Sequence, residues 1–304
     1  MTDGRCRTAG KLRSCGSLRT ETLPMSSPAA FCLRPWLTTA ALLVLAGCTS
    51  SAPRMSAVEA SVTTRAVGYL AADAVPDSLA LVPAPPAAGS AGFALDQQVS
   101  AEARALRGTA RFEQAHRDAE LGFPDGAQQF ACALDLDVDA QRTPALYRLL
   151  ERSRIDASAA TRAAKKHYER PRPFTVNNEP TCTPEDEDGL RRNGSYPSGH
   201  TAIGWAWALI LSEIAPARAD AIQARGRNYG ESRLVCNVHW QSDILEGRFM
   251  GAAAVARLHD NAAFNSDLKA ARAEIAAARK AGLHASRDCA AEENVLKVRP
   301  ASAL

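Results

Sequence analysis

The sequence predicts an all-α protein in which a single helical domain covers roughly residues 65–285. Stretches rich in Ala, Arg, Glu and Leu recur along this part of the chain, whereas alternating β-branched runs are nearly absent. No convincing internal repeat is visible. Apolar residues make up 46% and charged residues 23% of the 304 positions, which is the balance of an ordinary globular protein.

The first 48 residues predict a leader that ends in a lipoprotein signal peptide. Arg34 precedes an uncharged run that ends in the letters LAGC at Cys48 and is short for a membrane-spanning helix. This ending resembles the lipobox of bacterial lipoproteins, which implies an exported, periplasmic protein that is anchored to a membrane by a lipid on Cys48. The alternative is an ordinary secretory signal in which Cys48 has no role. Met25 is a second candidate for the true start, because residues 1–24 make a long leader.

Four cysteines follow the predicted signal peptide. An even number in an oxidising compartment predicts two disulfides, and three pairings are open. The alternative is four buried free thiols. No CxxC spacing occurs among them, which argues against a zinc site. The four residues are Cys132, Cys182, Cys236 and Cys289.

The charge of the chain argues against a nucleic-acid partner. The formal net charge is +3, but the segment before Cys48 alone contains six Lys or Arg and two acidic residues. The remaining chain is therefore close to neutral and lacks the basic excess of nucleic-acid-binding proteins.

Helical patterns follow the leader in order. Residues 49–64, rich in Ser, Ala and Thr, predict a tether, and the Pro- and Gly-rich residues 81–90 predict extended or turning chain. A long polar–apolar pattern then runs from Gln97 to Leu121. Two more helices are predicted at Thr143–Arg154 and Asp156–Glu169, the second with Asp156 as its N-cap.

The second half of the domain is predicted to contain one buried helix and three others. Residues 170–199 include five prolines and predict irregular chain. Thr201–Ile214 is strongly apolar and predicts the buried helix, although its uncharged part is too short to span a bilayer. The other helices are expected at Ala217–Tyr229, Gln241–Asp260 and Ser266–Ala281, before a C-terminal tail at residues 286–304.

Three separated segments carry side chains that suit phosphate. In the first, Lys165 lies near the end of a predicted helix, and Arg172 follows after six intervening residues in a stretch constrained by prolines. Because the arginine fork matches phosphate oxygens and lysine acts as a point charge, these two cations can converge on one anion. The alternative is a solvated basic helix end, since Arg162, Lys166 and Arg170 are neighbours.

The second segment is the octapeptide from Gly194 to Thr201, directly before the apolar helix. Ser198 and Gly199 offer a hydroxyl and unpaired backbone N–H groups to an anion at the helix N-terminus. His200 lies at the edge of that site, where an imidazole can exchange a proton. The alternative is a capped loop in which Ser198 is the N-cap and His200 is merely exposed.

The third segment contains Ser232 and Arg233, then His239 after five residues and Asp243 after three more. A spacing of four places His239 and Asp243 on one face of a helix, where the carboxylate can take the proton of one imidazole nitrogen and leave the other free. Arg233 adds a third cation. A metal site is one alternative, but no further ligands occur at helical spacing. A surface His–Asp pair is the other.

Taken in order, the three segments resemble the signature of the type 2 phosphatidic acid phosphatase superfamily. The octapeptide resembles the signature of class A bacterial nonspecific acid phosphatases, although a lipobox and four mature cysteines are not general features of that class. The resemblance covers roughly residues 80–260. It implies a helical bundle of the type shared with vanadium haloperoxidases, and an acid phosphatase that hydrolyses phosphate monoesters through a phosphohistidine without a metal or other cofactor.

The resemblance also implies residue roles. His239 is expected to be the nucleophile, Asp243 the residue that orients it, and His200 the general acid that protonates the leaving oxygen. Inorganic phosphate and vanadate are expected to inhibit by occupying the same site. The residues expected to hold the phosphoryl oxygens are Lys165, Arg172, Ser198, Gly199 and Arg233.

Other functions remain open at this point. A vanadium-dependent haloperoxidase would hold vanadate in the phosphate site, with His239 as its axial ligand. A non-catalytic periplasmic lipoprotein would account for the export signal and the helices but not for the placed polar residues. A membrane lipid phosphatase needs several spanning helices, which the sequence after Cys48 does not predict. The sequence leaves open the preferred ester and whether the chain forms a homo-oligomer.

Overall fold

A computed structural model describes residues 66–304, and every regular element in that range is helical. The predicted all-α class is therefore confirmed. The predictions for the leader, for Cys48 and for the tether at 49–64 concern residues outside this range. The helices are α1 (Ser78–Leu81), α2 (Ala91–Arg104), α3 (Ala110–Arg117), η1 (Asp125–Phe130), α4 (Ala131–Leu134), α5 (Pro144–Ala159), α6 (Arg162–Tyr168), α7 (Pro173–Asn177), η2 (Pro184–Asp186), α8 (Glu187–Arg191), α9 (Gly199–Ile214), η3 (Pro216–Arg218), α10 (Ala219–Val235), α11 (Gln241–Leu258), α12 (Ala262–Lys280) and α13 (Cys289–Leu296).

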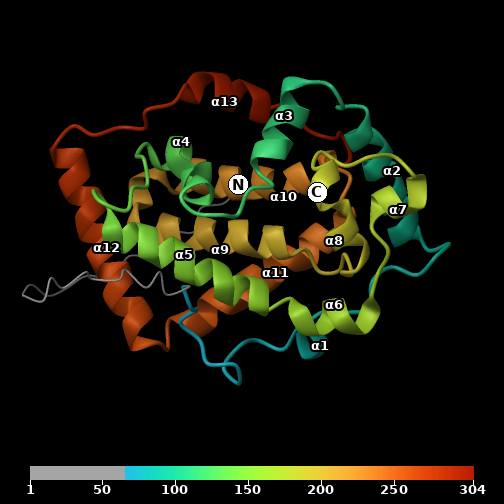
Figure 1. Cartoon of the computed structure of the whole chain (residues 1–304), viewed down its shortest axis with the longest axis horizontal. Helices are drawn as coiled ribbons and strands as arrows, with labels where there is room; N and C mark the ends of the chain where they lie inside the picture. Colours follow the sequence, from blue (N-terminus) through green and yellow to red (C-terminus); the bar gives the residue numbers. More distant parts are fainter. Residues whose placement is uncertain (1–65) are drawn as a thin grey trace, which may run out of the picture. The chain divides into compact units, whose positions relative to one another are not determined.

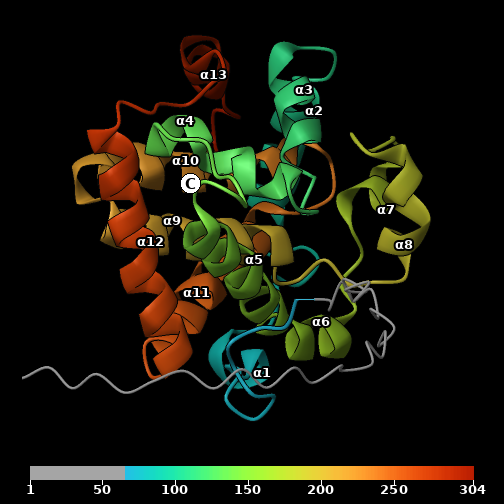
Figure 2. The ribbon, with the colours of Figure 1, turned by 60° about the vertical axis from the view of Figure 1, so that its left-hand side comes forward.

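Helix α9 is the centre of the domain. It packs against α10, α11, α5 and α12, which surround it in both ribbon views (Figures 1 and 2). Between its polar ends its sequence is strongly apolar, as expected for a helix that others cover, and Trp207 on it is fully buried. The buried helix predicted at Thr201–Ile214 is thus confirmed. None of the helices within 66–304 has the length and apolar character needed to cross a membrane.

Two glycines let α11 approach α9 closely. A Cβ atom on Gly247 would lie 2.7 Å from the carbonyl oxygen of Ser198, and one on Gly251 would lie 2.5 Å from that of Ala202. Any larger residue at these positions would push the two helices apart, since such distances are well inside van der Waals contact. The close packing brings the start of α11 beside the start of α9, where two of the three predicted segments lie.

Several predicted helix boundaries are wrong. The pattern from Gln97 to Leu121 is divided between α2 and α3 by a turn at residues 105–109, in which Gly108 has a φ of +73°. Asp156 is not an N-cap, because α5 continues through it to Ala159. Its carboxylate instead accepts hydrogen bonds from the backbone N–H groups of Tyr69 (2.8 Å) and Leu70 (3.1 Å).

The chain after residue 280 is bonded to the rest of the domain. The predicted tail at residues 286–304 contains α13, which the Cys132–Cys289 disulfide joins to α4. Farther on, the guanidinium of Arg299 pairs with the buried Glu231 on α10. The helical packing therefore continues past residue 285.

The second disulfide joins Cys182 to Cys236. Together with Cys132–Cys289, it selects one of the three pairings that the sequence leaves open. Cys236 directly follows α10, and Cys182 lies in the stretch at 170–199 that was predicted to be irregular. That stretch contains the short helices α7, η2 and α8. The disulfide fixes it against the end of α10.

Candidate active site

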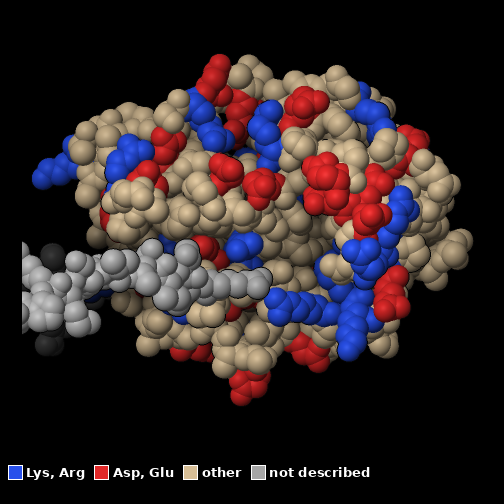
Figure 3. Space-filling model, viewed as in Figure 1, with Lys and Arg blue, Asp and Glu red and all other residues tan. Residues whose placement is uncertain are grey.

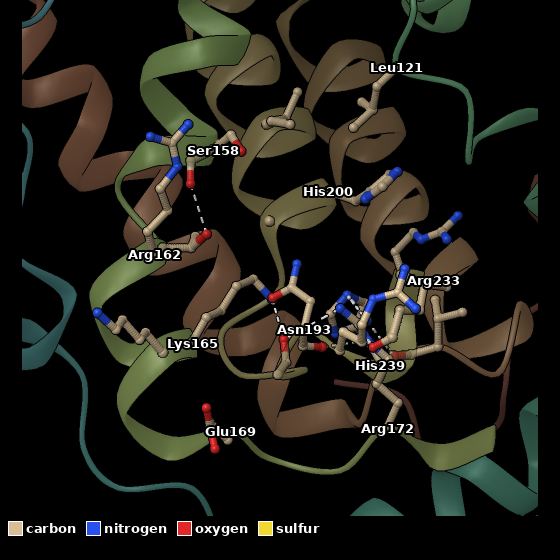
Figure 4. Close-up of a pocket in the computed structure, with 18 residues that line it drawn as sticks. Leu121, Ser158, Arg162, Lys165, Glu169, Arg172, Asn193, His200, Arg233 and His239 are labelled. Atoms are coloured by element: carbon tan, nitrogen blue, oxygen red, sulfur yellow. Dashed lines mark hydrogen bonds between the residues drawn. The ribbon is translucent and has the colours of Figure 1, made fainter. Parts of the chain in front are cut away.

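One cavity of about 430 Å³ gathers the three predicted segments (Figure 4). Ser198 and Asp243 are fully buried and do not line it. The predicted site residues on its wall are Lys165, Arg172, Gly199, His200, Arg233 and His239.

Backbone hydrogen bonds join the segments directly. The N–H of Ser195 donates to the carbonyl of Arg170 (2.9 Å), which joins the octapeptide to the first segment. The N–H of Ser198 donates to the carbonyl of Asp243 (2.9 Å), which joins it to the third. The octapeptide is therefore held between its two neighbours by main-chain contacts that do not depend on side chains.

His239 and Asp243 pair as predicted, but not on one helical face. His239 lies before α11, which begins at Gln241, and Asp243 is the third residue of that helix. One oxygen of the Asp243 carboxylate accepts the backbone N–H of Trp240 (2.8 Å) and lies 3.1 Å from Nδ1 of His239. The acid therefore caps the helix and orients the imidazole with the same oxygen.

The surroundings of His239 favour the neutral form of its imidazole. Burial lowers its pKa well below the usual value, and the nearby charges of Arg172 and Lys165 lower it further. Because the Asp243 carboxylate can only accept, we assign the proton to Nδ1. The lone pair on Nε2 then faces Nη1 of Arg172 at 3.2 Å. A phosphoryl group that takes this arginine N–H would release the lone pair for attack on phosphorus.

Arg170 and Asp96 join the contacts around His239, and the sequence patterns did not predict this. Nη1 of Arg170 donates to the second oxygen of Asp243 (2.6 Å), and Nη2 donates to Asp96 (2.7 Å). Both Arg170 and Asp96 are buried. Arg170 therefore orients the carboxylate that pairs with His239, and Asp96 holds the other nitrogen of the guanidinium.

Arg233 presents buried hydrogen-bond donors that lack acceptors. Its side chain is buried, and within the described residues its Nε and Nη1 atoms have no hydrogen-bond partner. Among residues 66–304, its side chain makes one hydrogen bond, a long one from Nη2 to the sulfur of Cys236 at 3.8 Å. Buried donors without acceptors are costly, so a guanidinium in this state is suited to an anion that enters the cavity.

Lys165 and Arg172 differ from Arg233 because backbone carbonyls already hold them. Nζ of Lys165 donates to the carbonyls of Gly194 (2.9 Å) and Ser195 (3.1 Å). Nη1 of Arg172 donates to that of Val238 at 3.0 Å. Burial, with the neighbouring cation second, lowers the pKa of Lys165, and burial lowers the pKa of Arg172 to about 10. In both side chains, burial of the charged group is the main cause.

Ser198 and Gly199 occupy the start of α9. The Ser198 hydroxyl oxygen accepts from the backbone N–H of Thr201 (3.2 Å) and from its hydroxyl (2.9 Å), so Ser198 is the N-cap of α9. Its own hydroxyl hydrogen remains able to donate. Gly199 is the first residue of the helix and lines the cavity, where its N–H belongs to the unpaired first turn.

His200 contributes a second imidazole to the same cavity. Its Nε2 lies 2.9 Å from the carbonyl oxygen of Ala119, which can only accept, so we assign a proton to Nε2. Burial, followed by the charge of Arg233, lowers the pKa of His200, whereas the Ala119 carbonyl raises it. Figure 4 shows His200 and His239 as separate rings, with Arg233 near both.

Further cations surround the mouth. Arg162, Lys166 and Arg192 line the cavity, with Glu169 as the one acidic residue among its lining residues. Figure 3 shows Lys and Arg side chains gathered over this face near α6. The entrance is therefore electrostatically attractive to anions.

Comparison with known proteins agrees with this geometry. Residues 154–265, which include all three segments, match the PAP2 superfamily. Over 213 residues the chain is 45% identical to a non-specific acid phosphatase of Providencia stuartii, covering 70% of this chain and 86% of that protein. It is 40% identical over 195 residues to a non-specific acid phosphatase of Salmonella typhimurium, covering 64% of this chain and 78% of that protein. It is 39% identical over 203 residues to an acid phosphatase of Zymomonas mobilis, covering 67% of this chain and 77% of that protein. The chain therefore belongs to the PAP2 superfamily, as an acid phosphatase of the class A bacterial nonspecific type.

Proposed function

We propose that this acid phosphatase hydrolyses phosphate monoesters through a covalent phosphohistidine at His239, with no metal ion. The observation that carries the proposal is the state of His239. Its Nδ1 lies 3.1 Å from the Asp243 carboxylate, and it lines a cavity that contains three buried or half-buried cations. Burial and the nearby cations lower its pKa, which favours the neutral form. A nucleophile with its orienting acid and its electrostatic surroundings is thereby assembled before substrate arrives.

In the first step, the Nε2 lone pair of His239 attacks phosphorus and the bond from phosphorus to the ester oxygen breaks. The departing oxygen takes a proton from Nδ1 of a protonated His200, and the alcohol leaves. In the second step, His200 removes a proton from a water molecule that attacks the phosphohistidine. The P–N bond breaks, which releases inorganic phosphate and regenerates neutral His239. Asp243 stabilises the imidazolium that carries the phosphoryl group between the two steps.

Lys165, Arg172 and Arg233 would hold the phosphoryl oxygens, together with the Gly199 N–H and the Ser198 hydroxyl. As phosphorus passes through its crowded, highly charged transition state, fixed cations stabilise the charge without having to reorganise. In many phosphoryl-transfer enzymes Mg²⁺ supplies this charge. Within residues 66–304, no group of three or more His, Cys, Asp or Glu side chains is arranged to hold a metal ion.

The lowered pKa of His200 is consistent with an enzyme that is active at acid pH. A general acid is active only while it holds its proton, and a lowered pKa restricts the protonated form of the free enzyme to lower pH. A bound phosphate dianion would offset the Arg233 charge and raise this pKa again. The Ala119 carbonyl favours the same protonated form, because it accepts the Nε2–H of the imidazolium.

A panel of phosphate esters assayed with and without EDTA tests the function and its metal independence together. We expect the purified protein to hydrolyse several monoesters equally well in EDTA, because arginine and lysine supply the positive charge. Vanadate should inhibit at low concentration, since it mimics the trigonal phosphoryl group within the same cations. Activity that disappears in EDTA and returns with Mg²⁺ or Zn²⁺ would overturn the metal-free mechanism.

We further propose that the enzyme is an exported, periplasmic lipoprotein anchored through Cys48. The two disulfides support export, because such bonds persist in oxidising compartments and are rare in the cytosol.

The anchor is tested by the substitution Cys48→Ser in the full-length precursor. Without the thiol that carries the lipid, the enzyme should move from the membrane fraction to the soluble periplasmic fraction, with its specific activity unchanged. Cell fractionation with an activity assay measures this, and the unaltered precursor is the control. A variant that stays with the membrane contradicts the lipid anchor.

A further inference from the structure

Asp118, a buried carboxylate outside the cavity, directly precedes Ala119, whose carbonyl accepts from His200. Asp118 follows the last residue of α3, and its side chain is fully buried. One of its oxygens accepts from Nη2 of Arg225 (2.5 Å) and Nε2 of Gln114 (2.8 Å). The other accepts from the hydroxyl of Ser232 (2.5 Å) and Nη1 of Arg225 (3.2 Å). Both oxygens are therefore fully occupied by fixed donors.

These contacts set the position of the next carbonyl along the chain. Ala119 directly follows Asp118, and its oxygen accepts from His200 at 2.9 Å. Main-chain hydrogen bonds also hold the turn that follows α3. The N–H of Asp118 donates to the carbonyl of Gln114, and the N–H of Ala119 donates to that of His116. Leu121, two residues farther on, lines the cavity, and Figure 4 shows it near His200. Movement of the Asp118 side chain would therefore move the wall that carries the acceptor for His200.

The same carboxylate connects this wall to α10. Arg225 and Ser232 both lie on α10, and Ser232 directly precedes the phosphate-facing Arg233. The guanidinium of Arg225 is buried, and its other acidic contact is Glu292 at 3.5 Å. Asp118 makes the two-pronged contact with this guanidinium and supplies its nearer counter-charge, so it holds Arg225 in place.

We propose that Asp118 is a positioning residue for the general acid: by fixing the Ala119 carbonyl relative to α10, it holds His200 in the orientation that protonates the leaving oxygen. The inference rests on the proposed role of His200. Nδ1 of His200 must point at the departing ester oxygen, and the hydrogen bond from Nε2 to Ala119 is what fixes the rotation of the ring. If the Ala119 carbonyl moves, the His200 ring loses its orientation. The rate then falls only for substrates whose leaving oxygen must receive a proton.

The substitution Asp118→Asn tests this, because it keeps the shape of the side chain and removes its charge. The readout is the ratio of kcat/KM on glycerol phosphate to kcat/KM on p-nitrophenyl phosphate, since the alkoxide needs a proton and the nitrophenolate does not. We expect the ratio to fall by on the order of 10-fold, a part of the ~10²–10⁴-fold that general acid catalysis typically contributes. An equal loss on both esters would mean that Asp118 is only structural.

Asp267→Asn is the matched control. Asp267 is also a buried carboxylate, it accepts from Nη2 of Arg148 (2.6 Å) and the hydroxyl of Tyr69 (2.8 Å), and it does not line the cavity. Its substitution should leave the ratio unchanged whatever it does to stability. If Asp118→Asn does not fold, Arg225→Lys decides the question by the same ratio, because it keeps the charge and loses the two-pronged contact to Asp118.

A double-mutant cycle separates this inference from the function on which it rests. In a His200→Ala background no general acid remains to be positioned. The double variant should therefore have the same kcat/KM ratio as His200→Ala alone. A further fall would show that Asp118 acts by another route and would overturn the inference. If His200→Ala by itself leaves the wild-type ratio unchanged, the general-acid role fails, and that result does not depend on Asp118.

Discussion

The substitution His239→Ala is expected to reduce kcat/KM on every phosphate ester by on the order of 10⁵-fold or more, the scale of losses seen when a covalent nucleophile is removed. The reason is that Nε2 of His239 would accept the phosphoryl group, and within residues 66–304 the cavity has no second nucleophile paired with an acid. Because attack is lost for all substrates, p-nitrophenyl phosphate and glycerol phosphate should suffer alike.

Initial rates on both esters measure this effect, with thermal unfolding to establish that the variant folds. His259→Ala is the control, since His259 is exposed, pairs with Glu213 and does not line the cavity. That variant should be as active as the unaltered enzyme. Retention of more than about a hundredth of the activity in His239→Ala would remove His239 from the nucleophile's role.

The substitution His200→Ala is expected to separate substrates by their leaving groups. Loss of the proton donor should cost ~10²–10⁴-fold on glycerol phosphate, the usual contribution of general acid catalysis. The cost on p-nitrophenyl phosphate should be far smaller, because a nitrophenolate leaves readily without a proton. His239, its acid and the cations all remain in this variant, so attack on phosphorus itself is preserved.

The comparison of kcat/KM on the two esters measures the separation, and the His259→Ala variant again serves as control. Equal losses on both esters would indicate that His200 positions the phosphate instead of donating a proton. In that case the cavity would still hold a nucleophile and its cations, but the leaving oxygen would depart with water as its proton source.

Local sequence patterns predict much of this fold because they report on nearby residues. The apolar stretch from Thr201 to Ile214 predicts a buried helix, and α9 is that helix with two more residues at its start. Asp156 is assigned wrongly because an acid before a helical pattern favours a cap, whereas its partners here are the N–H groups of Tyr69 and Leu70. These partners are 87 and 86 residues away in the sequence, and contacts over such a distance leave no periodic signal in a single sequence.

The same limit applies to the site. Spacing places His239 and Asp243 together, although the pair is formed by a helix cap and not by a helical face. Arg170 stands in the sequence among several basic neighbours, and its buried role depends on Asp96, which is 74 residues away. Asp118 has no motif of its own, and its contact with Arg225 is set only by how α3 packs on α10.

Trapping of the phosphoenzyme tests the phosphohistidine mechanism most directly. The enzyme would be mixed with p-nitrophenyl phosphate, stopped within milliseconds in denaturant at alkaline pH, where phosphohistidine survives, and digested for mass spectrometry. The account predicts an acid-labile phosphoryl group on the peptide that contains His239, present in His200→Ala and missing in His239→Ala. A phosphoryl group on the His200 peptide, or one that persists in His239→Ala, would contradict it.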